Sequence, residues 1–348
     1  MAMRSVIHVG NFLSRRGYNR SPVEDLSDRM RAAGWEVHQT SSVEFRPFRL
    51  VDMAATVWGK RRHFAVGHIS VFSGPAFLWA ETTALAMRAA GRPFVLSLHG
   101  GNLPVFARRW PVRVRRLLAS ASAVVAPSRY LLETMRPYRA DLQLIPNPIA
   151  LDRFAFRLRR QAQPNLVWLR AFHHIYNPSL APRVISELAA EFPAICLVMA
   201  GPDKGDGSRE HTLQTIAELG VGNRITMPGK VSREGLGAVL GQGDIFINTT
   251  NIDNTPVSVL EAMASGLCVV STTVGGIPYL MEHEKDALLV PPNDPRAMAA
   301  AVRRILSDPD LAQHLSSNAR QKVDRFDWSK VLPQWESLFI SVIDRSLN

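Results

Sequence analysis

Cysteine is almost absent from this chain, which has two among its 348 residues. Cys196 and Cys268 each lie inside an apolar run, so we expect buried, reduced side chains that behave as small hydrophobes. Two cysteines exclude a disulfide framework and a metal site built on several thiolates.

Long apolar runs are also lacking. Residues 63–80 form a long stretch without Asp, Glu, Lys or Arg, but glycine, proline, serine and histidine interrupt it. Such a stretch is a poor membrane-spanning helix. The first ten residues, MAMRSVIHVG, lack the long apolar core and cleavage site of a signal peptide. We therefore expect a cytoplasmic protein, which could lie peripherally on the cytoplasmic face of the membrane.

Acidic residues are scarce in the first half of the chain. Residues 1–155 hold 22 Lys and Arg against 10 Asp and Glu, whereas the remainder holds 19 against 20. Basic residues gather beside aromatic ones in 58–62 and in 106–118, the second with five arginines. An anionic membrane surface suits this composition, and a solvated basic face is the alternative. No recognition helix or RNA-binding motif accompanies the charge, so no nucleic-acid partner is predicted.

The length suits two domains, and short apolar runs alternate with helical patterns along the whole chain. This alternation predicts an α/β protein with parallel sheets. The Arg- and Gln-rich segment 155–164 has the composition of a linker. We expect domains at 1–155 and 165–325, followed by an amphipathic helix within 326–348.

The most informative stretch is 248–278, NTTNIDNTPVSVLEAMASGLCVVSTTVGGIP. A buried strand is expected before it. Thr255 is expected to cap the following helix, and Pro256 suits the first turn of that helix. The amides of such a turn suit a phosphate. Glu261, about one and a half turns further on, is placed to accept hydrogen bonds from a ribose diol, and Asp253 precedes the helix on its loop. The stretch therefore predicts a nucleotide-sugar site.

Asp253 and Glu261, eight positions apart, followed by Gly275-Gly276-Ile277-Pro278, resemble the donor site of retaining family-4 glycosyltransferases of the GT-B fold. The resemblance implies two Rossmann-like domains facing each other across a cleft, with the last helix crossing back onto the N-terminal domain. It also implies transfer of a hexosyl group from a nucleotide-diphosphate sugar to a saccharide or lipid-linked acceptor. No metal or other cofactor is expected, since no Asp-x-Asp motif stands at a strand end.

Further matches extend over the whole chain and are weaker before residue 150. The resemblance implies that His99, Arg170 and Asp253 surround the transferred sugar and its leaving phosphate. It implies a donor-binding role for Gly17, Gly201, Val231, Asn254, Thr255, Pro256, Val257, Glu261 and Gly276.

One departure from the family pattern is serious. A lysine about six residues after the arginine binds the donor diphosphate in the family, but Tyr176 and Asn177 stand there, and no lysine occurs between Lys60 and Lys204. A catalytically weak or inactive nucleotide-sugar-binding protein is therefore an alternative, as is a nucleotide-sugar epimerase of the same fold. The expected role is cell-surface polysaccharide or glycolipid synthesis, with the sugar, base, acceptor and oligomeric state left open.

Overall fold

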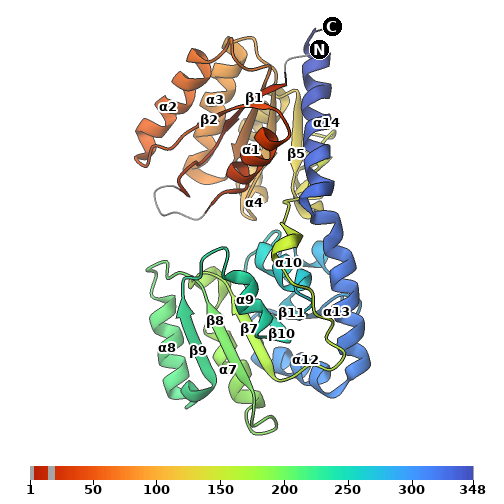
Figure 1. Cartoon of the computed structure of the whole chain (residues 1–348). Helices are drawn as coiled ribbons and strands as arrows, with labels where there is room; N and C mark the ends of the chain where they lie inside the picture. Colours follow the sequence, from red (N-terminus) through yellow and green to blue (C-terminus); the bar gives the residue numbers. More distant parts are fainter. Residues whose placement is uncertain (1–3, 15–19, 348) are drawn as a thin grey trace. The chain divides into compact units, whose positions relative to one another are not determined.

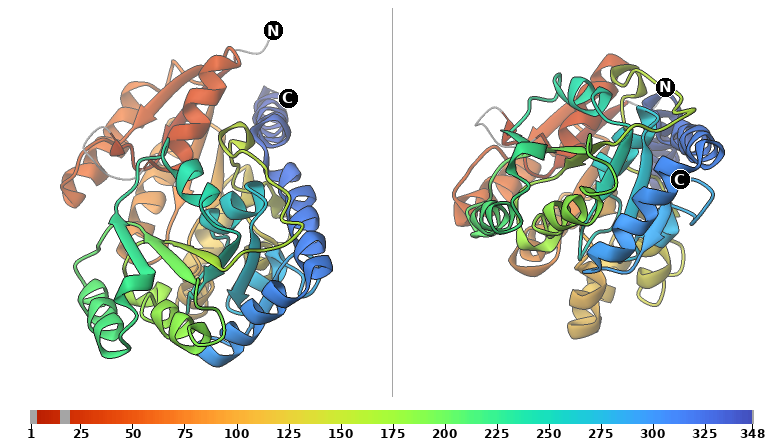
Figure 2. Two further views of the ribbon diagram at one scale, coloured as in Figure 1. Left: turned by 60° about the horizontal axis from the view of Figure 1, so that its bottom comes forward. Right: turned by 90° about the horizontal axis from the view of Figure 1, so that it is seen from below.

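The computed structural model describes residues 4–14 and 20–347. The chain divides into two compact units, one formed by residues 1–148 with 328–348 and the other by residues 149–327. Each unit contains one six-stranded sheet in which all neighbouring strands are parallel. Helices lie on both faces of each sheet (Figures 1 and 2). Each unit is thus Rossmann-like, and the predicted α/β fold class is confirmed.

The first unit has the strand order β2-β1-β3-β4-β5-β6. Because consecutive strands are parallel, each connection crosses over the sheet, and helices form most of these connections. The strands are β1 (Ser5–Val9), β2 (Glu36–Thr40), β3 (Val66–Val71), β4 (Phe94–Leu98), β5 (Ala123–Ala126) and β6 (Gln143–Leu144). The helices are α1 (Pro22–Ala32), α2 (Arg46–Gly59), α3 (Phe77–Ala89), α4 (Leu103–Arg109), α5 (Pro111–Ser120), α6 (Arg129–Met135) and α14 (Trp328–Leu347).

The last helix, α14, belongs to the first unit although the second unit precedes it in the chain. It contacts α1 and β3, and the indole Nε1 of Trp35 donates a hydrogen bond of 2.9 Å to Glu336. Trp335, Leu338 and Phe339 are buried on its inner side. The predicted return of the last helix to the N-terminal domain is therefore confirmed.

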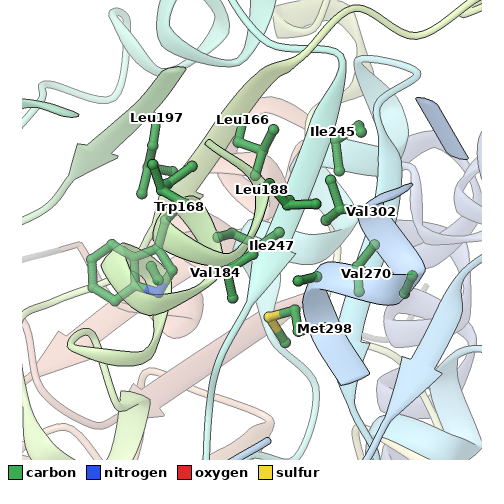
Figure 3. Packing of buried hydrophobic residues seen from close by; sticks show 14 of the residues in the cluster. Leu166, Trp168, Val184, Leu188, Leu197, Ile245, Ile247, Val270, Met298 and Val302 are labelled. Atoms are coloured by element: carbon green, nitrogen blue, oxygen red, sulfur yellow. The ribbon is translucent and has the colours of Figure 1, made fainter. Parts of the chain in front are cut away.

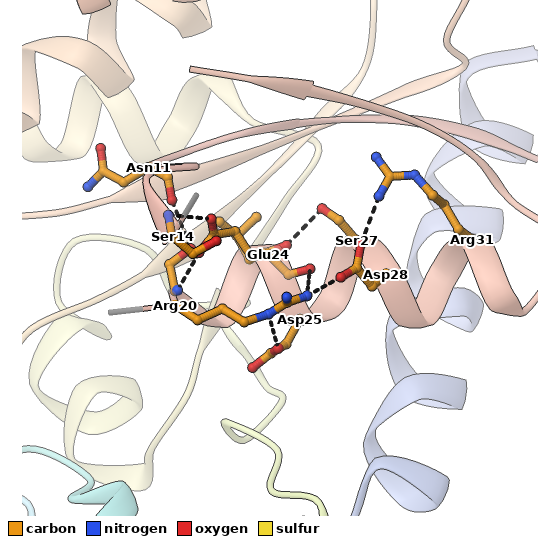
Figure 4. Close-up of polar contacts among 10 residues, drawn as sticks. Asn11, Ser14, Arg20, Glu24, Asp25, Ser27, Asp28 and Arg31 are labelled. Carbon is orange, nitrogen blue, oxygen red and sulfur yellow. Dashed lines mark hydrogen bonds and ion pairs between the residues drawn. The ribbon is translucent and has the colours of Figure 1, made fainter. Parts of the chain in front are cut away.

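A buried carboxylate fixes the start of α1. Glu24 accepts hydrogen bonds from the backbone N–H groups of Ser14 (3.1 Å) and Ser21 (2.6 Å), as Figure 4 shows. On the exposed side of the same helix, Arg20 pairs with Asp25 and Asp28. Glu24 thus anchors the chain on both sides of residues 15–19 to the helix. Gly17, predicted to approach the donor, lies outside the described residues.

The second unit has the strand order β12-β11-β10-β7-β8-β9. Its strands are β7 (Asn165–Leu169), β8 (Cys196–Ala200), β9 (Ile225–Gly229), β10 (Ile245–Asn248), β11 (Cys268–Thr272) and β12 (Leu288–Val290). Its helices are α7 (Leu180–Leu188), α8 (Ser208–Glu218), α9 (Leu236–Gly241), α10 (Val257–Ala264), α11 (Ile277–Leu280), α12 (Pro295–Ser307) and α13 (Pro309–Val323).

The core of this unit lies on both faces of its sheet, because its central strands are buried on both sides. On one face, Leu166, Ile245 and Val270 pack beneath α7 and α12 (Figure 3). On the other face, Val167 and Phe246 pack with residues of α10 and α13. The two layers of helices hold the strands rigidly, so the loops at the strand ends start from fixed positions.

Candidate functional site

The loops at the carboxyl edge of the second sheet carry most of the predicted donor site. Parallel strands end at the same edge, and ligands of open α/β sheets bind there. Arg170 directly follows β7 and Gly201 directly follows β8, while Asp253 and Gly276 lie in the loops after β10 and β11. These four strands are neighbours in the sheet. Val231 lies two residues beyond β9, which ends at the same edge.

Arg170 and Asp253 form an ion pair, with side chains 12% and 11% exposed. The phenol ring of Tyr176 lies over the guanidinium, 4.0 Å from its carbon to the ring centroid. Burial raises the pKa of Asp253, while the positive charge of Arg170 opposes the rise. The Nε of Arg170 is buried and has no hydrogen-bond partner among the described residues. A buried N–H of this kind is costly to leave unpaired, so it is suited to a ligand oxygen.

Tyr176 stands where the family pattern has its second cation. In the structure, the ring of Tyr176 restrains Arg170 through a cation–π contact and adds no charge. We did not predict this contact from the sequence, because the absence of a lysine does not indicate where the replacing side chain points.

Glycine is required at three places in these loops by close backbone approach. A Cβ on Gly276 would lie 2.0 Å from the carbonyl oxygen of Asn254, and one on Gly275 would lie 2.1 Å from that of Asp253. A Cβ on Gly201 would lie 1.8 Å from the carbonyl oxygen of Arg170. The glycines therefore hold the loops of Arg170 and Asp253 in place by direct backbone packing.

The helix after Asp253 begins one to two residues later than predicted. Pro256 is the N-cap of α10, and the hydroxyl of Thr255 makes no capping bond. The expectation that Thr255 caps the helix is therefore wrong, because Pro256 is still in the extended region and turns the chain only after itself. The Oγ1 of Thr255 is buried without a partner among the described residues. The first helical amides are those of Val257 and Ser258, which lack intrahelical acceptors by helix geometry.

Glu261 lies in the second turn of α10 and is partly buried. Burial raises the pKa of its carboxyl to about 7, and the positive charges of Arg233 and Arg170 act against that shift. The carboxyl is thus near half-protonation at neutral pH without a ligand. A ribose diol that donates two hydrogen bonds would favour the carboxylate form.

His99 lies in the first unit, just after β4, whereas the other predicted site residues that the structure describes belong to the second unit. Its ring stacks on Phe72 with centroids 5.1 Å apart, and its Nε2 lies 3.0 Å from the hydroxyl of Ser97. Burial lowers the pKa of His99 to about 4, so the ring is neutral at neutral pH. Ser97 and His68, which are hydrogen-bonded in series to His99, were not predicted to be functional.

One group among the described residues has the spacing of a metal site, namely His173, His174 and Asp206. The amide N–H of Ile175 donates to the Nδ1 of His173 at 3.3 Å. That nitrogen then carries the lone pair, so a neutral His173 holds its proton on the Nε2 that faces Asp206. Asp206 accepts from the backbone N–H and ring of His174. These contacts fit a hydrogen-bonded cluster better than a metal ion, which would need an unprotonated Nε2.

The comparisons with known proteins agree with this fold. The family described as Glycosyltransferase Family 4 matches residues 4–153, and the family described as Glycosyl transferases group 1 matches residues 154–322. The two matches together cover nearly the whole chain, and the solved structures similar to it include glycosyltransferases. The chain belongs to the group 1, family-4 glycosyltransferases, with the GT-B type of fold.

Individual relatives are distant. An N-acetyl-alpha-D-glucosaminyl L-malate synthase of Bacillus anthracis is 23% identical over 271 residues, which are 73% of this chain and 69% of the relative. The putative colanic acid biosynthesis glycosyltransferase WcaL of Salmonella typhimurium is 35% identical over 127 residues, 34% of this chain and 31% of the relative.

Solved structures match nearly the full length. A sucrose-phosphate synthase from Thermosynechococcus elongatus has a TM-score of 0.81 at 18% identity, covering 98% of this chain and 100% of that structure. Anabaena Alr3699/HepE in complex with UDP-glucose has a TM-score of 0.74 at 16% identity, covering 97% and 99%. At these identities the likeness establishes the fold alone.

No helix in the part of the chain that the structure describes combines the length and apolar character needed to cross a bilayer.

Proposed function

We propose that this protein is a retaining glycosyltransferase that uses a nucleotide-diphosphate sugar and no metal ion. The observation that carries the proposal is a pair of buried polar atoms at the carboxyl edge of the second sheet, Arg170 Nε and Thr255 Oγ1, which have no hydrogen-bond partner in the described part of the chain. Family membership and a neighbour bound to UDP-glucose support a nucleotide-sugar donor.

In this proposal Arg170 binds the donor diphosphate. One terminal nitrogen stays on Asp253, and the guanidinium still offers Nε and its other N–H groups to phosphate oxygens. The amides of Val257 and Ser258 add dipoles at the start of α10. Together they offset the charge that builds on the leaving phosphate.

The other donor groups divide between nucleoside and sugar. Glu261 accepts the ribose hydroxyls, and Asp253 and Gly276 adjoin the transferred sugar. His99 contributes from the first unit. The acceptor we propose belongs to cell-surface polysaccharide or glycolipid synthesis, a role supported by the name of the relative WcaL.

A nucleotide-sugar-binding protein without transferase activity is the second candidate. It is favoured by Tyr176, which restrains Arg170 but adds no second cation. This candidate predicts that the donor binds and is never consumed.

The experiment is calorimetry with a panel of nucleotide sugars, with donor hydrolysis followed on the same samples. We expect one donor to bind, to be hydrolysed slowly, and to behave identically with and without EDTA. Arg170→Ala should lower the hydrolysis rate about 100-fold, the scale of losing one oxyanion-type donor. Arg183→Ala, on the exposed face of α7, is the matched control. Binding without hydrolysis would favour the second candidate, and no binding would overturn both.

We also propose that the first unit docks on an anionic membrane surface. Helix α2 is apolar on two sides: Met53 and Val57 are buried, but Phe48, Val51 and Trp58 are 66%, 64% and 49% exposed. The exposed three follow a spacing of three and seven residues, so they form one stripe along the helix. Exposed apolar stripes of this kind suit the headgroup boundary of a bilayer.

Positive charge flanks the apolar stripe. Lys60, Arg61 and Arg62 follow α2 directly, and the guanidinium of Arg61 lies over the ring of Trp58 at 4.5 Å. Helix α3, which contacts both α2 and α5, adds the exposed Leu85. Basic residues next to a bilayer contribute about 1 kcal/mol each with anionic lipid.

Vesicle flotation tests the docking. The protein should bind vesicles that contain phosphatidylglycerol and leave pure phosphatidylcholine vesicles free. A Phe48→Ser, Val51→Ser double variant should bind at least about tenfold more weakly, since two apolar side chains no longer insert. Leu213→Ser, at an exposed apolar position of α8 in the second unit, is the control. Equal binding of all three proteins would contradict the proposal.

A further inference from the structure

Three histidines and one serine form a continuous chain of hydrogen bonds across the first sheet. The Nδ1 atoms of His8 and His68 are 2.8 Å apart, and these residues are register partners on β1 and β3. The Nε2 of His68 lies 2.8 Å from the hydroxyl of Ser97 on β4, which lies 3.0 Å from the Nε2 of His99. The chain therefore leads from the sheet interior to the residue proposed to meet the sugar.

The inner part of the chain is enclosed by aromatic side chains of α14. His8 and His68 are 0% and 2% exposed. Trp335 lies 4.8 Å from the ring of His68, and Phe339 lies 6.1 Å from the ring of His8, centroid to centroid. Burial lowers the pKa of His8 to about 3 and that of His68 well below its ordinary value, so neither is charged at neutral pH.

Among the described residues the Ser97 hydroxyl hydrogen-bonds only with His68 and His99, so its own proton lies on one of these two bonds. Neutral rings then allow two proton arrangements along the chain. A neutral imidazole has one N–H and one bare nitrogen, and His68 uses both of its nitrogens in the chain. If His8 donates to His68, then His68 donates to Ser97 and Ser97 to the Nε2 of His99, whose proton is on Nδ1. In the reverse arrangement His99 carries its proton on Nε2, and His8 carries an N–H on its own Nε2.

The buried end of the chain distinguishes the two arrangements. The Nε2 of His8 is buried and has no partner within residues 4–14 and 20–347. The reverse arrangement leaves an N–H there without an acceptor, whereas the first leaves only a bare nitrogen. Buried N–H groups without partners are the rarer case in proteins, so the first arrangement is favoured.

We propose that Ser97, backed by His68 and His8, is a positioning residue that holds His99 as the neutral Nδ1–H tautomer. Ser97 donates to the Nε2 of His99 and so fixes the ring plane and leaves Nδ1–H as the free donor. This rests on the proposed function, in which His99 contributes to binding of the donor sugar; the free Nδ1–H would donate to a hydroxyl of that sugar. In a free neutral imidazole side chain the Nε2–H form predominates, so the chain selects the minor form.

A matched pair of substitutions isolates the hydroxyl. Ser97→Thr keeps the hydroxyl, and Ser97→Val replaces it with a side chain that has the shape of threonine but no hydroxyl. Both introduced residues are β-branched and suit strand β4. A cavity of about 30 Å³ lined by His68 and His99 lies beside Ser97 and offers room for a water, and the valine is chosen because its added methyl group should fill this space. A water is thereby kept from restoring the lost bond.

The experiment is ¹⁵N NMR of histidine-labelled protein, combined with donor hydrolysis kinetics. We expect the Nδ1–H form of His99 in the wild type and in Ser97→Thr, and the Nε2–H form in Ser97→Val. The kcat of Ser97→Val should fall about 10–100-fold, by analogy with the loss seen when the hydrogen-bond partner of a metal-ligating histidine is removed, with the donor KM within about twofold. An Nε2–H form in the wild type, or one tautomer in all three proteins, would overturn the proposal.

The two readouts separate this inference from the proposed function. The tautomer of the wild type is measured without any substrate, so it tests the proton arrangement even in a protein that transfers no sugar. Failure of the proposed function shows instead as a wild type that consumes no donor. Loss of kcat in Ser97→Val with an unchanged tautomer would also overturn the positioning role.

Discussion

Glu261 offers a prediction in which stability and binding change in opposite directions. Its carboxyl is partly buried beside the proposed ribose site, and burial raises its pKa to about 7 from an ordinary value of 4.5. The folded protein therefore holds the proton more tightly than the unfolded chain does. The stability contributed by the protonated form is complete below pH 4.5 and is lost as the pH rises through 7. Glu261→Gln removes this loss, because the amide does not titrate.

The size of the stability difference follows from the pKa shift of Glu261. Each pKa unit corresponds to about 1.4 kcal/mol, so the variant should be more stable than the wild type by about 3 kcal/mol at pH 8 and by almost nothing at pH 4.5. Donor binding should weaken at pH 8, since the ribose loses hydrogen bonds to a charged acceptor worth about 1.5–3 kcal/mol. That is a rise in the donor Kd of about 10–150-fold.

The assay is urea unfolding of both proteins from pH 4.5 to 8, with calorimetry of the donor at pH 8. Glu218→Gln, at an exposed position that ends α8, is the control and should show no pH-dependent difference. A stability difference that stays constant across the pH range would refute the reasoning about burial. A donor Kd unchanged by Glu261→Gln would refute the ribose assignment.

Two further substitutions test the packing that supports the site. Gly276→Ala should destabilise the second unit by about 2 kcal/mol or more in thermal unfolding, because its Cβ meets the carbonyl of Asn254, whereas Gly241→Ala, which meets nothing, should not. Asp244→Asn should cost about 3 kcal/mol in urea unfolding, because Asp244 is the buried ion-pair partner of Arg159, and an undiminished midpoint would contradict that.

The fold was largely predictable because both sheets leave a strong pattern in the sequence. Buried parallel strands appear as short apolar runs, and the runs at 94–98 and 166–169 coincide with β4 and β7 almost residue for residue. Helix boundaries were less accurate. The start of α10 moved past Thr255 because the extended backbone of Pro256 depends on the loop around Asp253, which local preference does not describe.

The residues of the donor site were identifiable from their spacing, yet their contacts were not. The ion pair between Arg170 and Asp253 joins segments more than 80 residues apart. The cation–π contact of Tyr176 depends on the path of a short loop. Sequence spacing indicates which strand ends carry polar groups, and only the packed loops determine which of those groups touch.

Two further features that the sequence did not predict lie in the first unit. His8 and His68 are each a single histidine within an apolar strand, and a single histidine of this kind does not indicate a function. Their pairing follows from the register of β1 and β3. The exposed stripe of α2 was hidden because the helix is apolar on both sides. A sequence pattern distinguishes apolar from polar positions, but the packing decides which apolar side is buried.

The central claim is that the edge of the second sheet binds and activates a sugar nucleotide. The most direct measurement is a comparison of donor hydrolysis kinetics for Arg170→Ala, Glu261→Ala and the Arg183→Ala control. We expect a lowered kcat for Arg170→Ala, a raised donor KM for Glu261→Ala, and wild-type values for the control. An unchanged kcat/KM in both site variants would contradict the assignment of this edge as the donor site.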